Sequence, residues 1–282
     1  SVAGDQEKSQ RGHYEGPVHR ANAMAVAITG AAGAVGSVVR GAFDPEQRQL
    51  LTHRPQDDLT TTVVDVGDRA AVIDALEDVD VLVHLAWSPA APDVWPEGHP
   101  ENVAGTVNVL DAAVANDVQR VVLASSIHAV GAANNADPST MESTVADPSV
   151  VVDPEDLPTP NSYYGVAKLT CEALGRFYVH RYGLEVVSLR LGWLLPADEL
   201  QSLVETAARE RIRFARANWI SPRDCRAVFA AAVRTDDLDS PPPLAAISAN
   251  ADRYCTLTAT MRTLGYRPKD DAAAVLEDGA ER

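Results

Sequence analysis

The feature that most constrains the fold is a glycine-punctuated stretch near the start of the chain, residues 25–40. An apolar run over residues 25–28 predicts a buried parallel strand, and the residues after the last glycine predict a helix. Between them lie Gly30, Gly33 and Gly36, with the spacing G-x-x-G-x-x-G. A small-residue turn in an alanine-rich chain looks similar. The strand before the turn and the helix after it favour a dinucleotide-binding turn instead.

Each glycine of such a turn has its own physical role. The first takes a positive φ, the second leaves room for a pyrophosphate, and the third lets the helix pack closely on the strand. Backbone N–H groups and the positive end of the helix dipole then face the phosphates. We therefore expect Gly30, Gly33 and Gly36 to bind a dinucleotide.

Strands and helices alternate after this turn, which predicts an α/β fold with a doubly wound parallel sheet. At 46% hydrophobic residues, the chain can build a sizeable core. Asp68 is a candidate N-cap for the helix over 69–76. The other predicted strands cover residues 48–54, 61–68, 80–86, 119–124 and 184–191, and further helices are expected from Asn102 and from Tyr163.

Three regions are expected along the chain. Residues 1–22 are polar and precede Met24, so they are expected to be a disordered tail or a remnant that is not native. Residues 23–192 are expected to form the dinucleotide-binding domain, and 193–282 a small substrate lobe. In that lobe we predict one helix over 198–215, a helix over 223–234 capped by Ser221, a strand over 244–248 and a final helix before Gly265. The polar stretch 134–160 predicts a long loop, which is a candidate lid.

The end of the second strand bears on the choice of cofactor. In sheets of this type a carboxylate there binds the adenine ribose and selects NAD. Here the strand ends in Thr52, His53 and Arg54, and Arg54 can pair with a 2′-phosphate, which favours NADP. The nearby Asp57 or Asp58 can still serve NAD. Asp65 and Val66 are expected beside the adenine, and Ser88, after the fourth strand, is a candidate substrate contact.

A tyrosine and a lysine one helical turn apart carry the predicted chemistry. Tyr164 and Lys168 stand at i and i+4 on one helix face. An ammonium beside a phenol lowers the pKa of the phenol, so that it can take a proton from an alcohol while hydride passes to a nicotinamide. Ser126, at the end of the fifth strand, is the expected third donor. Alone, such a pair is common by chance. The glycine turn and the strand that ends in Ser125-Ser126 favour a catalytic pair instead.

Together these segments resemble the short-chain dehydrogenase/reductase superfamily, in its extended branch, the NAD-dependent epimerase/dehydratase group. The resemblance implies a Rossmann fold with Ser126, Tyr164 and Lys168 as the catalytic set. Tyr163 is the rival tyrosine, but only Tyr164 has a lysine four residues later. The matching segments are Thr29–Gly36, His84–Ala86, Asn102–Asn108, Ser125-Ser126, Tyr164–Lys168 and Leu189–Gly192. The further cofactor contacts implied are Ala34, Val35, Leu85, Ala86, Asn102 and Leu191.

Within that branch the chain looks most similar to uronate dehydrogenases and related aldose 1-dehydrogenases. The similarity rests on Ser125-Ser-Ile-His128 and on Trp219-Ile-Ser-Pro-Arg-Asp224. Ile127 replaces an asparagine of that subgroup, which leaves room for a neutral pentose or hexose. The implied substrate contacts are Ser88, Ser126, Ile127, His128, Asn161, Tyr164 and Trp193.

The expected function is thus NAD(P)-dependent oxidation of an aldose or uronate at its anomeric carbon to the lactone. The alternatives are a nucleotide-sugar epimerase or dehydratase, which recycles its hydride, and a non-catalytic NAD(P)-binding protein of the same fold. We also expect a homo-oligomer.

Charge and cysteine content restrict the partners and the compartment. The net charge of −16 argues against nucleic acid and anionic membranes as partners, and it suggests a protein adapted to high salt. No apolar run long enough to span a membrane is present, and the N-terminus lacks the apolar stretch of a signal peptide. The widely spaced Cys171, Cys225 and Cys255 form no metal-binding motif, so no metal is expected, and they indicate a reducing, cytoplasmic setting.

Overall fold

The protein is described here from a computed structural model. It describes residues 24–89, 94–134, 149–236, 238 and 240–280. The N-terminal segment expected to be a tail, and most of the 134–160 stretch expected to be a lid, lie outside the described residues. Within the described part of the chain, no helix is both long and apolar enough to cross a bilayer.

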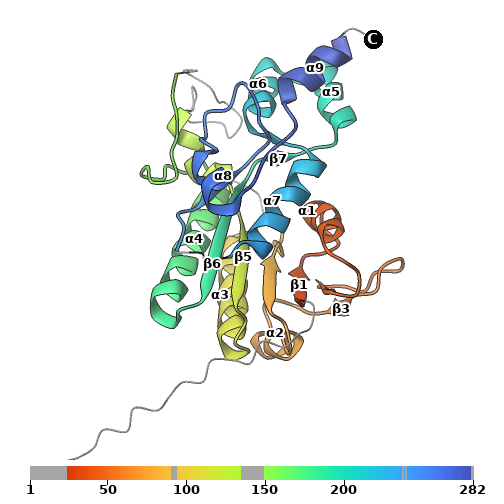
Figure 1. Ribbon diagram of the computed structural model, residues 1–282, viewed down its shortest axis with the longest axis vertical. Coiled ribbons are helices and arrows are strands. Elements are labelled where there is room, and N and C mark those ends of the chain that lie inside the picture. Colours follow the sequence, from red (N-terminus) through yellow and green to blue (C-terminus); the bar gives the residue numbers. More distant parts are fainter. Residues whose placement is uncertain (1–23, 90–93, 135–148, 237, 239, 281–282) are drawn as a thin grey trace, which may run out of the picture.

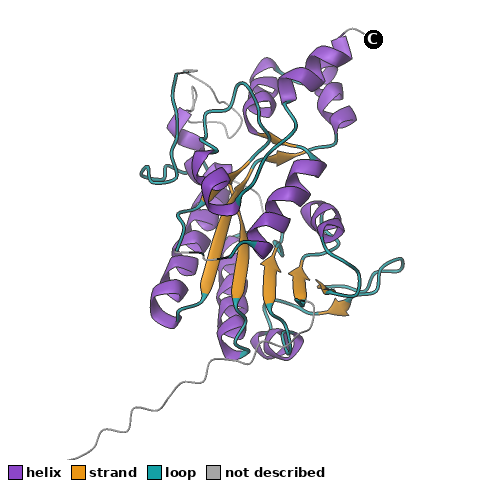
Figure 2. Cartoon of the chain, viewed as in Figure 1, coloured by secondary structure: helices purple, strands orange, loops and turns teal. Residues whose placement is uncertain are grey.

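Seven parallel strands form the main sheet, in the order β3-β2-β1-β4-β5-β6-β9 (Figure 1). The predicted doubly wound parallel sheet is therefore confirmed. Helices flank the sheet on both faces (Figure 2). The strands are β1 (Val26–Thr29), β2 (Arg48–Thr52), β3 (Thr62–Val63), β4 (Val81–His84), β5 (Arg120–Ser126), β6 (Glu185–Leu191) and β9 (Leu244–Ala246).

Alternating side chains of the strands enter two separate cores. On β1, Ala27 packs into a cluster with α2 (Arg69–Ala75), α3 (His99–Ala115) and α4 (Tyr163–Tyr182). Val26 and Ile28 pack into the other cluster with α1 (Ala34–Val39), α7 (Pro222–Arg234) and α8 (Thr258–Leu264). Because successive strand residues point to opposite faces, a strand buried on both sides reads as a continuous apolar run.

The capping residues and the glycine that the sequence analysis named mark the ends of several helices. Asp68 caps α2 by accepting hydrogen bonds from the backbone N–H groups of Ala70 and Ala71, and Ser221 caps α7 through Asp224 N. Gly265, with φ of 65°, ends α8. Short 3-10 turns follow α1 and β5, over Arg40–Ala42 and Ile127–Asn134.

Two predictions in the C-terminal part were wrong. The single helix expected over 198–215 is two helices, α5 (Ala197–Thr206) and α6 (Arg209–Asn218). They are separated by extended backbone at Ala207 and Ala208, and the break lets Leu200 of α5 and Ala215 of α6 pack into one small cluster. The helix before Gly265 is not the last, because α9 (Ala272–Ala280) follows and packs into the same cluster.

The chain after residue 192 contributes to two parts of the molecule. Helices α5, α6 and α9 gather at one end (top of Figure 1), beside a two-stranded parallel sheet of β7 (Trp193–Leu194) and β8 (Trp219–Ile220). The chain then returns, and β9 pairs with β6 as the last strand of the main sheet. The domain boundary at residue 192 remains a prediction, and β9 and α7 lie on the main-sheet side of the fold.

Candidate active site

The glycine turn between β1 and α1 is built so that two glycines are obligatory. Gly30 has φ of +66°, and a Cβ there would lie 2.7 Å from Ala86 N. A Cβ on Gly36 would lie 2.2 Å from Gly30 O, so the helix approaches the strand at backbone contact. A Cβ on Gly33 would meet only Gly30 O, at 3.2 Å. The face of Gly33 is thus open, which is the cradle that a pyrophosphate needs.

A neutral histidine links the end of β1 to the neighbouring strand β4. His84 Nδ1 lies 2.8 Å from Thr29 Oγ1, and the same hydroxyl accepts from the backbone N–H groups of Leu85 and Ala86. Burial, and secondarily the charge of Lys168, lower the pKa of His84 to about 3. The histidine therefore stays uncharged and has a structural role.

A cavity of about 620 Å³ opens beside the turn, at the carboxyl ends of β4, β5 and β6. Ligands of open α/β sheets bind at this edge. The cavity brings together all three expected catalytic residues. Its lining comprises Ala34, Val35, Leu85, Trp87, Ala124, Ser125, Ser126, Ile127, His128, Tyr164, Lys168, Leu191, Gly192, Trp193, Leu194, Arg211 and Phe214.

Lys168 is fixed by two contacts at the cavity floor. Its Nζ donates a 2.8 Å hydrogen bond to Ala124 O and lies 3.5 Å from the ring centroid of Trp87. Burial lowers the pKa of Lys168 to about 8, and Cys171 and Glu172 oppose that shift. The amine is thus mostly an ammonium at neutral pH and loses its charge at mildly alkaline pH.

Tyr164 lies in the same cavity, with its ring edge-on to Trp87 and His128 at 5.7 Å each. Burial raises the pKa of Tyr164, and a hydrogen bond with Ser126 opposes that shift. The expectation that Lys168 lowers this pKa does not hold in the structure. Lys168 Nζ is 5.7 Å from the phenol ring centroid and is bonded to Ala124 O, so burial dominates.

The opposite wall of the cavity is aromatic. His128 stacks on Phe214 of α6, with ring centroids 5.5 Å apart and planes at 14°, and its Nδ1 lies 3.2 Å from Asn161 Oδ1. Burial lowers the pKa of His128, and the contact with Asn161 opposes that shift. Trp193 lies against Phe214 at 5.8 Å and under the guanidinium of Arg211 at 4.9 Å. This wall presents flat aromatic surfaces, a neutral imidazole and, at Trp193, the guanidinium of Arg211.

The predicted substrate contacts divide into two groups. Ser126, Ile127, His128, Tyr164 and Trp193 line the cavity. Asn161 does not line it and instead contacts His128 from behind. Ser88 is exposed and outside the lining, and its backbone N and O are held by the side-chain amide of Asn102. The amide of Asn102, expected to contact the cofactor, is therefore engaged with the 87–89 loop.

The predicted cofactor contacts extend from the cavity to the outer end of β2. Ala34, Val35, Leu85, Tyr164, Lys168 and Leu191 line the cavity. Ala86, Arg54, Asp65 and Val66 lie outside its lining. Arg54 is exposed just beyond β2. Asp65 Oδ1 accepts from Gly67 N, so this carboxylate also shapes its own turn.

Comparison with known proteins agrees with this geometry. The sequence pattern of the NAD dependent epimerase/dehydratase family matches residues 26–204. This chain belongs to that family.

Two relatives of this family member come from Haloferax volcanii. The chain is 43% identical to L-arabinose 1-dehydrogenase (NAD(P)(+)), over 89% of this chain and 99% of that protein. It is 31% identical to NAD-dependent glucose-6-phosphate dehydrogenase, over 90% and 96%. Among solved structures, uronate dehydrogenase from Agrobacterium tumefaciens superposes with a TM-score of 0.73 at 25% identity, covering 92% of this chain and 89% of that one.

Trp87, Arg211 and Phe214 are among the cavity residues of this family member that were not predicted from the sequence. Trp87 directly follows the predicted strand over 80–86, and an aromatic residue at the ligand end of a strand was an available signal. Arg211 and Phe214 lie on α6, and nothing in their local sequence places them at the cavity. Their position depends on how α6 folds back between β7 and β8.

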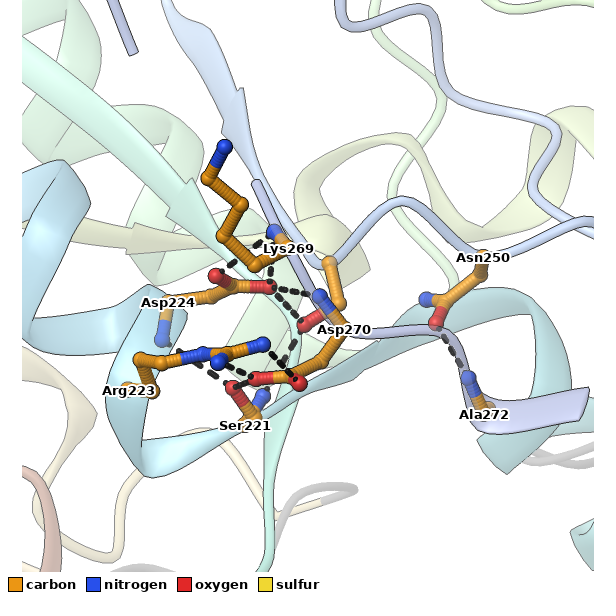
Figure 3. Close-up of polar contacts among 8 residues, drawn as sticks. Ser221, Arg223, Asp224, Asn250, Lys269, Asp270 and Ala272 are labelled. Carbon is orange, nitrogen blue, oxygen red and sulfur yellow. Dashed lines mark hydrogen bonds and ion pairs between the residues drawn. The ribbon is translucent and has the colours of Figure 1, made fainter. Parts of the chain in front are cut away.

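The segment Trp219–Asp224, singled out in the sequence, anchors the C-terminal segment rather than lining the cavity (Figure 3). The fully buried Asp224 carboxylate accepts hydrogen bonds from Ser248 Oγ and from the backbone N–H groups of Lys269 and Asp270. Asp270 in turn pairs with Arg223 and accepts from Ser221. Asn250 donates to Trp219 O and accepts from Ala272 N, which joins the start of α9 to β8.

Proposed function

We propose that the protein is an NAD(P)-dependent sugar 1-dehydrogenase that oxidises an aldose, a neutral pentose such as L-arabinose, to its lactone. The observation that carries this proposal is the convergence of Ser126, Tyr164 and Lys168 in one cavity beside the glycine turn. The 43% identity to an L-arabinose 1-dehydrogenase over nearly the whole chain supports the choice of sugar. The aromatic wall, with Ile127 beside it, suits a neutral sugar ring.

The chemistry follows from three side chains of this chain. A bound nicotinamide supplies the acceptor for the hydride that leaves the anomeric carbon. Tyr164, as phenolate, takes the proton of the anomeric hydroxyl, so that the C–O bond becomes the carbonyl of the lactone. Ser126 Oγ holds the reacting oxygen. The Lys168 ammonium binds the nicotinamide ribose. His128 and Trp193 contact the sugar ring.

A substrate panel tests the proposal. The purified protein is incubated with L-arabinose, D-xylose, D-galactose, D-glucose 6-phosphate or D-glucuronate, each with NAD or NADP, and reduced nicotinamide is followed by absorbance. We expect the largest kcat/KM with a neutral pentose. A larger kcat/KM with D-glucuronate would contradict the proposal that the substrate is a neutral sugar. No net reduction with any sugar, together with interconversion of a nucleotide sugar, would establish an epimerase instead.

For the cofactor we propose a preference for NADP, supported by Arg54 two residues beyond the end of β2. An exposed guanidinium there can bind a 2′-phosphate with two hydrogen bonds. Arg54→Ala is expected to raise the KM for NADP about tenfold, the loss of one charge-assisted contact, and to leave the KM for NAD unchanged. Equal effects on both coenzymes would show that Arg54 does not bind the 2′-phosphate. Asp57 and Asp58 would then be substituted to test whether they bind NAD.

A high-salt cytoplasm is the proposed setting. The net charge of −16 and the two Haloferax volcanii relatives support it, and the three free, buried cysteines are typical of a reducing compartment. Salt screens repulsion between surface carboxylates. Activity and melting temperature are therefore expected to rise between low and molar KCl. A flat or falling dependence on KCl would contradict salt adaptation.

We also propose a homo-oligomer, formed through α4. Val166 and Phe177 are 36% and 53% exposed. Eleven residues are about three helical turns, so these two side chains lie on the same side of the helix. We take this side of α4 as the proposed interface because association would cover both apolar side chains. Light scattering at the salt concentration of best activity measures the mass, and a monomer would exclude this assembly.

A further inference from the structure

A buried ion pair lies directly behind the cavity and has no part in the chemistry described above. Glu172 and Arg190 are each only 4% exposed. Arg190 Nε donates to Glu172 Oε1 and Nη2 donates to Oε2, both at 2.9 Å. Ser125 Oγ donates a 2.6 Å hydrogen bond to the same Oε1. One carboxylate is thus bonded to residues of two neighbouring strands.

Each partner in this cluster stands next to a residue of the cavity. Glu172 is four residues after Lys168 on α4, so the two side chains share a helix face. Ser125 precedes Ser126 on β5, and Arg190 precedes Leu191 on β6; Ser125 and Arg190 face each other in the strand register. Lys168 Nζ bonds Ala124 O, one residue before Ser125. Two successive residues of β5 are therefore fastened to two successive turns of α4.

We propose that Glu172 is a positioning residue for the reaction: by holding α4 against β5 and β6, it fixes Lys168 and Tyr164 relative to Ser126. This inference rests on the proposed dehydrogenase function. Glu172 does not line the cavity, so it acts through the residues that it holds.

The charge of Glu172 gives the cluster a second effect. The titratable and charged groups that face Lys168 are Tyr164, Cys171 and Glu172 on α4, His84 on β4 and, through Glu172, Arg190 on β6. Burial raises the pKa of Tyr164 and Cys171 and lowers that of His84, so all three are neutral near pH 7. Cys171 and Glu172 both oppose the lowering of the Lys168 pKa by burial, and with the Cys171 thiol neutral near pH 7 the remaining negative charge is that of Glu172. Its removal leaves Arg190 nearby, and both changes lower the pKa of Lys168 further.

The chain contains only three lysines, Lys8, Lys168 and Lys269, so the Lys168 amine can be observed directly. In full-length protein labelled at lysine ¹³Cε, three NMR signals are expected, and Lys168→Met identifies the one from Lys168. In the unsubstituted protein that signal should titrate at about pH 8. In Glu172→Gln it should titrate roughly one pH unit lower. An unchanged titration would overturn the charge effect.

Kinetics with the best sugar of the panel form the second arm. Glu172→Gln is expected to lower kcat about tenfold or more, with little change in the KM of the sugar, because binding groups remain while the reacting groups shift. The pH at which the rate stops rising should move lower together with the Lys168 titration. A folded variant with unchanged kcat would overturn the positioning role. If the unsubstituted protein oxidises no sugar, the proposed function is wrong. The NMR titration still tests whether Glu172 sets the pKa of Lys168.

The chain offers a matched control at the other end of the same strand pair. Arg120 of β5 pairs with Glu185 of β6 at 2.6 Å, five residues and about 17 Å from the Ser125–Arg190 position. Glu185→Gln removes an ion pair across the same strands, and we expect wild-type titration of Lys168 and wild-type kcat. If it changes both as Glu172→Gln does, the effect is one of general stability and the proposal is wrong.

Loss of Glu172 leaves a buried arginine without its partner, which can prevent folding. Ser125→Ala avoids this, since it removes one hydrogen bond and keeps both charges. It is expected to lower kcat several-fold while the Lys168 titration stays at about pH 8. An unchanged kcat in this variant would overturn the positioning role without reference to Glu172→Gln.

Discussion

Tyr164→Phe is expected to lower kcat for sugar oxidation about a thousandfold, the usual contribution of a positioned general base. The substitution removes one oxygen from a ring that otherwise keeps its contacts with Trp87 and His128. Cofactor affinity should therefore change little. Initial rates give kcat, and quenching of protein fluorescence on titration with NADP gives the dissociation constant.

The adjacent tyrosine is a matched control for this substitution. Tyr163 is 48% exposed, lies against Trp95 and is not in the cavity lining. Tyr163→Phe should keep the rate of the unsubstituted protein. A rate for Tyr164→Phe within a few-fold of that of Tyr163→Phe would show that another group removes the proton.

The pH dependence follows from the same site. Because the pKa of Tyr164 is raised by burial, the phenol is protonated at neutral pH and the phenolate fraction grows as the pH increases. The ammonium of Lys168 is lost above about pH 8. The oxidation rate should thus rise from neutral pH to about pH 8 and level off above it, because the loss of the ammonium then offsets the growing phenolate fraction.

Gly36→Ala is expected to destabilise the fold by about 3 kcal/mol, since the clash is with backbone and not with a side chain that can move. The added Cβ would lie 2.2 Å from Gly30 O and 2.8 Å from Ala31 C. For a chain of this size that corresponds to a melting temperature roughly 5–10 °C lower, measured by thermal unfolding without cofactor.

Gly33→Ala separates stability from cofactor binding. Its Cβ would meet one atom, Gly30 O at 3.2 Å, so the melting temperature should stay close to that of the unsubstituted protein. The methyl group would occupy the open face of the turn, and NADP affinity should fall about tenfold or more. If Gly33→Ala bound NADP normally, the phosphates would not lie over this glycine. If Gly36→Ala were as stable as Gly33→Ala, the close approach of α1 to β1 would be wrong.

The sequence predicted those features that depend on short-range patterns. The glycine spacing, the strand runs and the i, i+4 relation of Tyr164 and Lys168 are properties of one segment each, so they can be read locally. The caps at Asp68 and Ser221 are local as well. In contrast, Arg211 and Phe214 reach the cavity through the packing of α6. The extended break at Ala207 and Ala208 contains no glycine or proline from which it could be predicted.

The pKa of Tyr164 shows a second limit. Its direction depends on how deeply the phenol is buried and on where Lys168 Nζ points, toward Ala124 O rather than toward the phenol. Neither follows from helical spacing. Similarly, Asn102 lies where expected on α3, but its amide is engaged by the backbone of Ser88, a contact between segments fourteen residues apart.

The path of the chain between β6 and β9 has a consequence for how sugar selectivity can change. Helices α5 and α6 form an excursion that leaves the main sheet after Gly192 and rejoins it through α7. At the point of departure, a Cβ on Gly192 would lie 2.0 Å from Asn218 O, so both ends of the excursion touch. Such an excursion can be exchanged for that of a relative without altering β5, which holds Ser126, or α4, which holds Tyr164 and Lys168. Because Arg211 and Phe214 of the cavity wall lie within this excursion, substitutions in residues 195–218 would reshape that wall while the rest of the cavity is left in place.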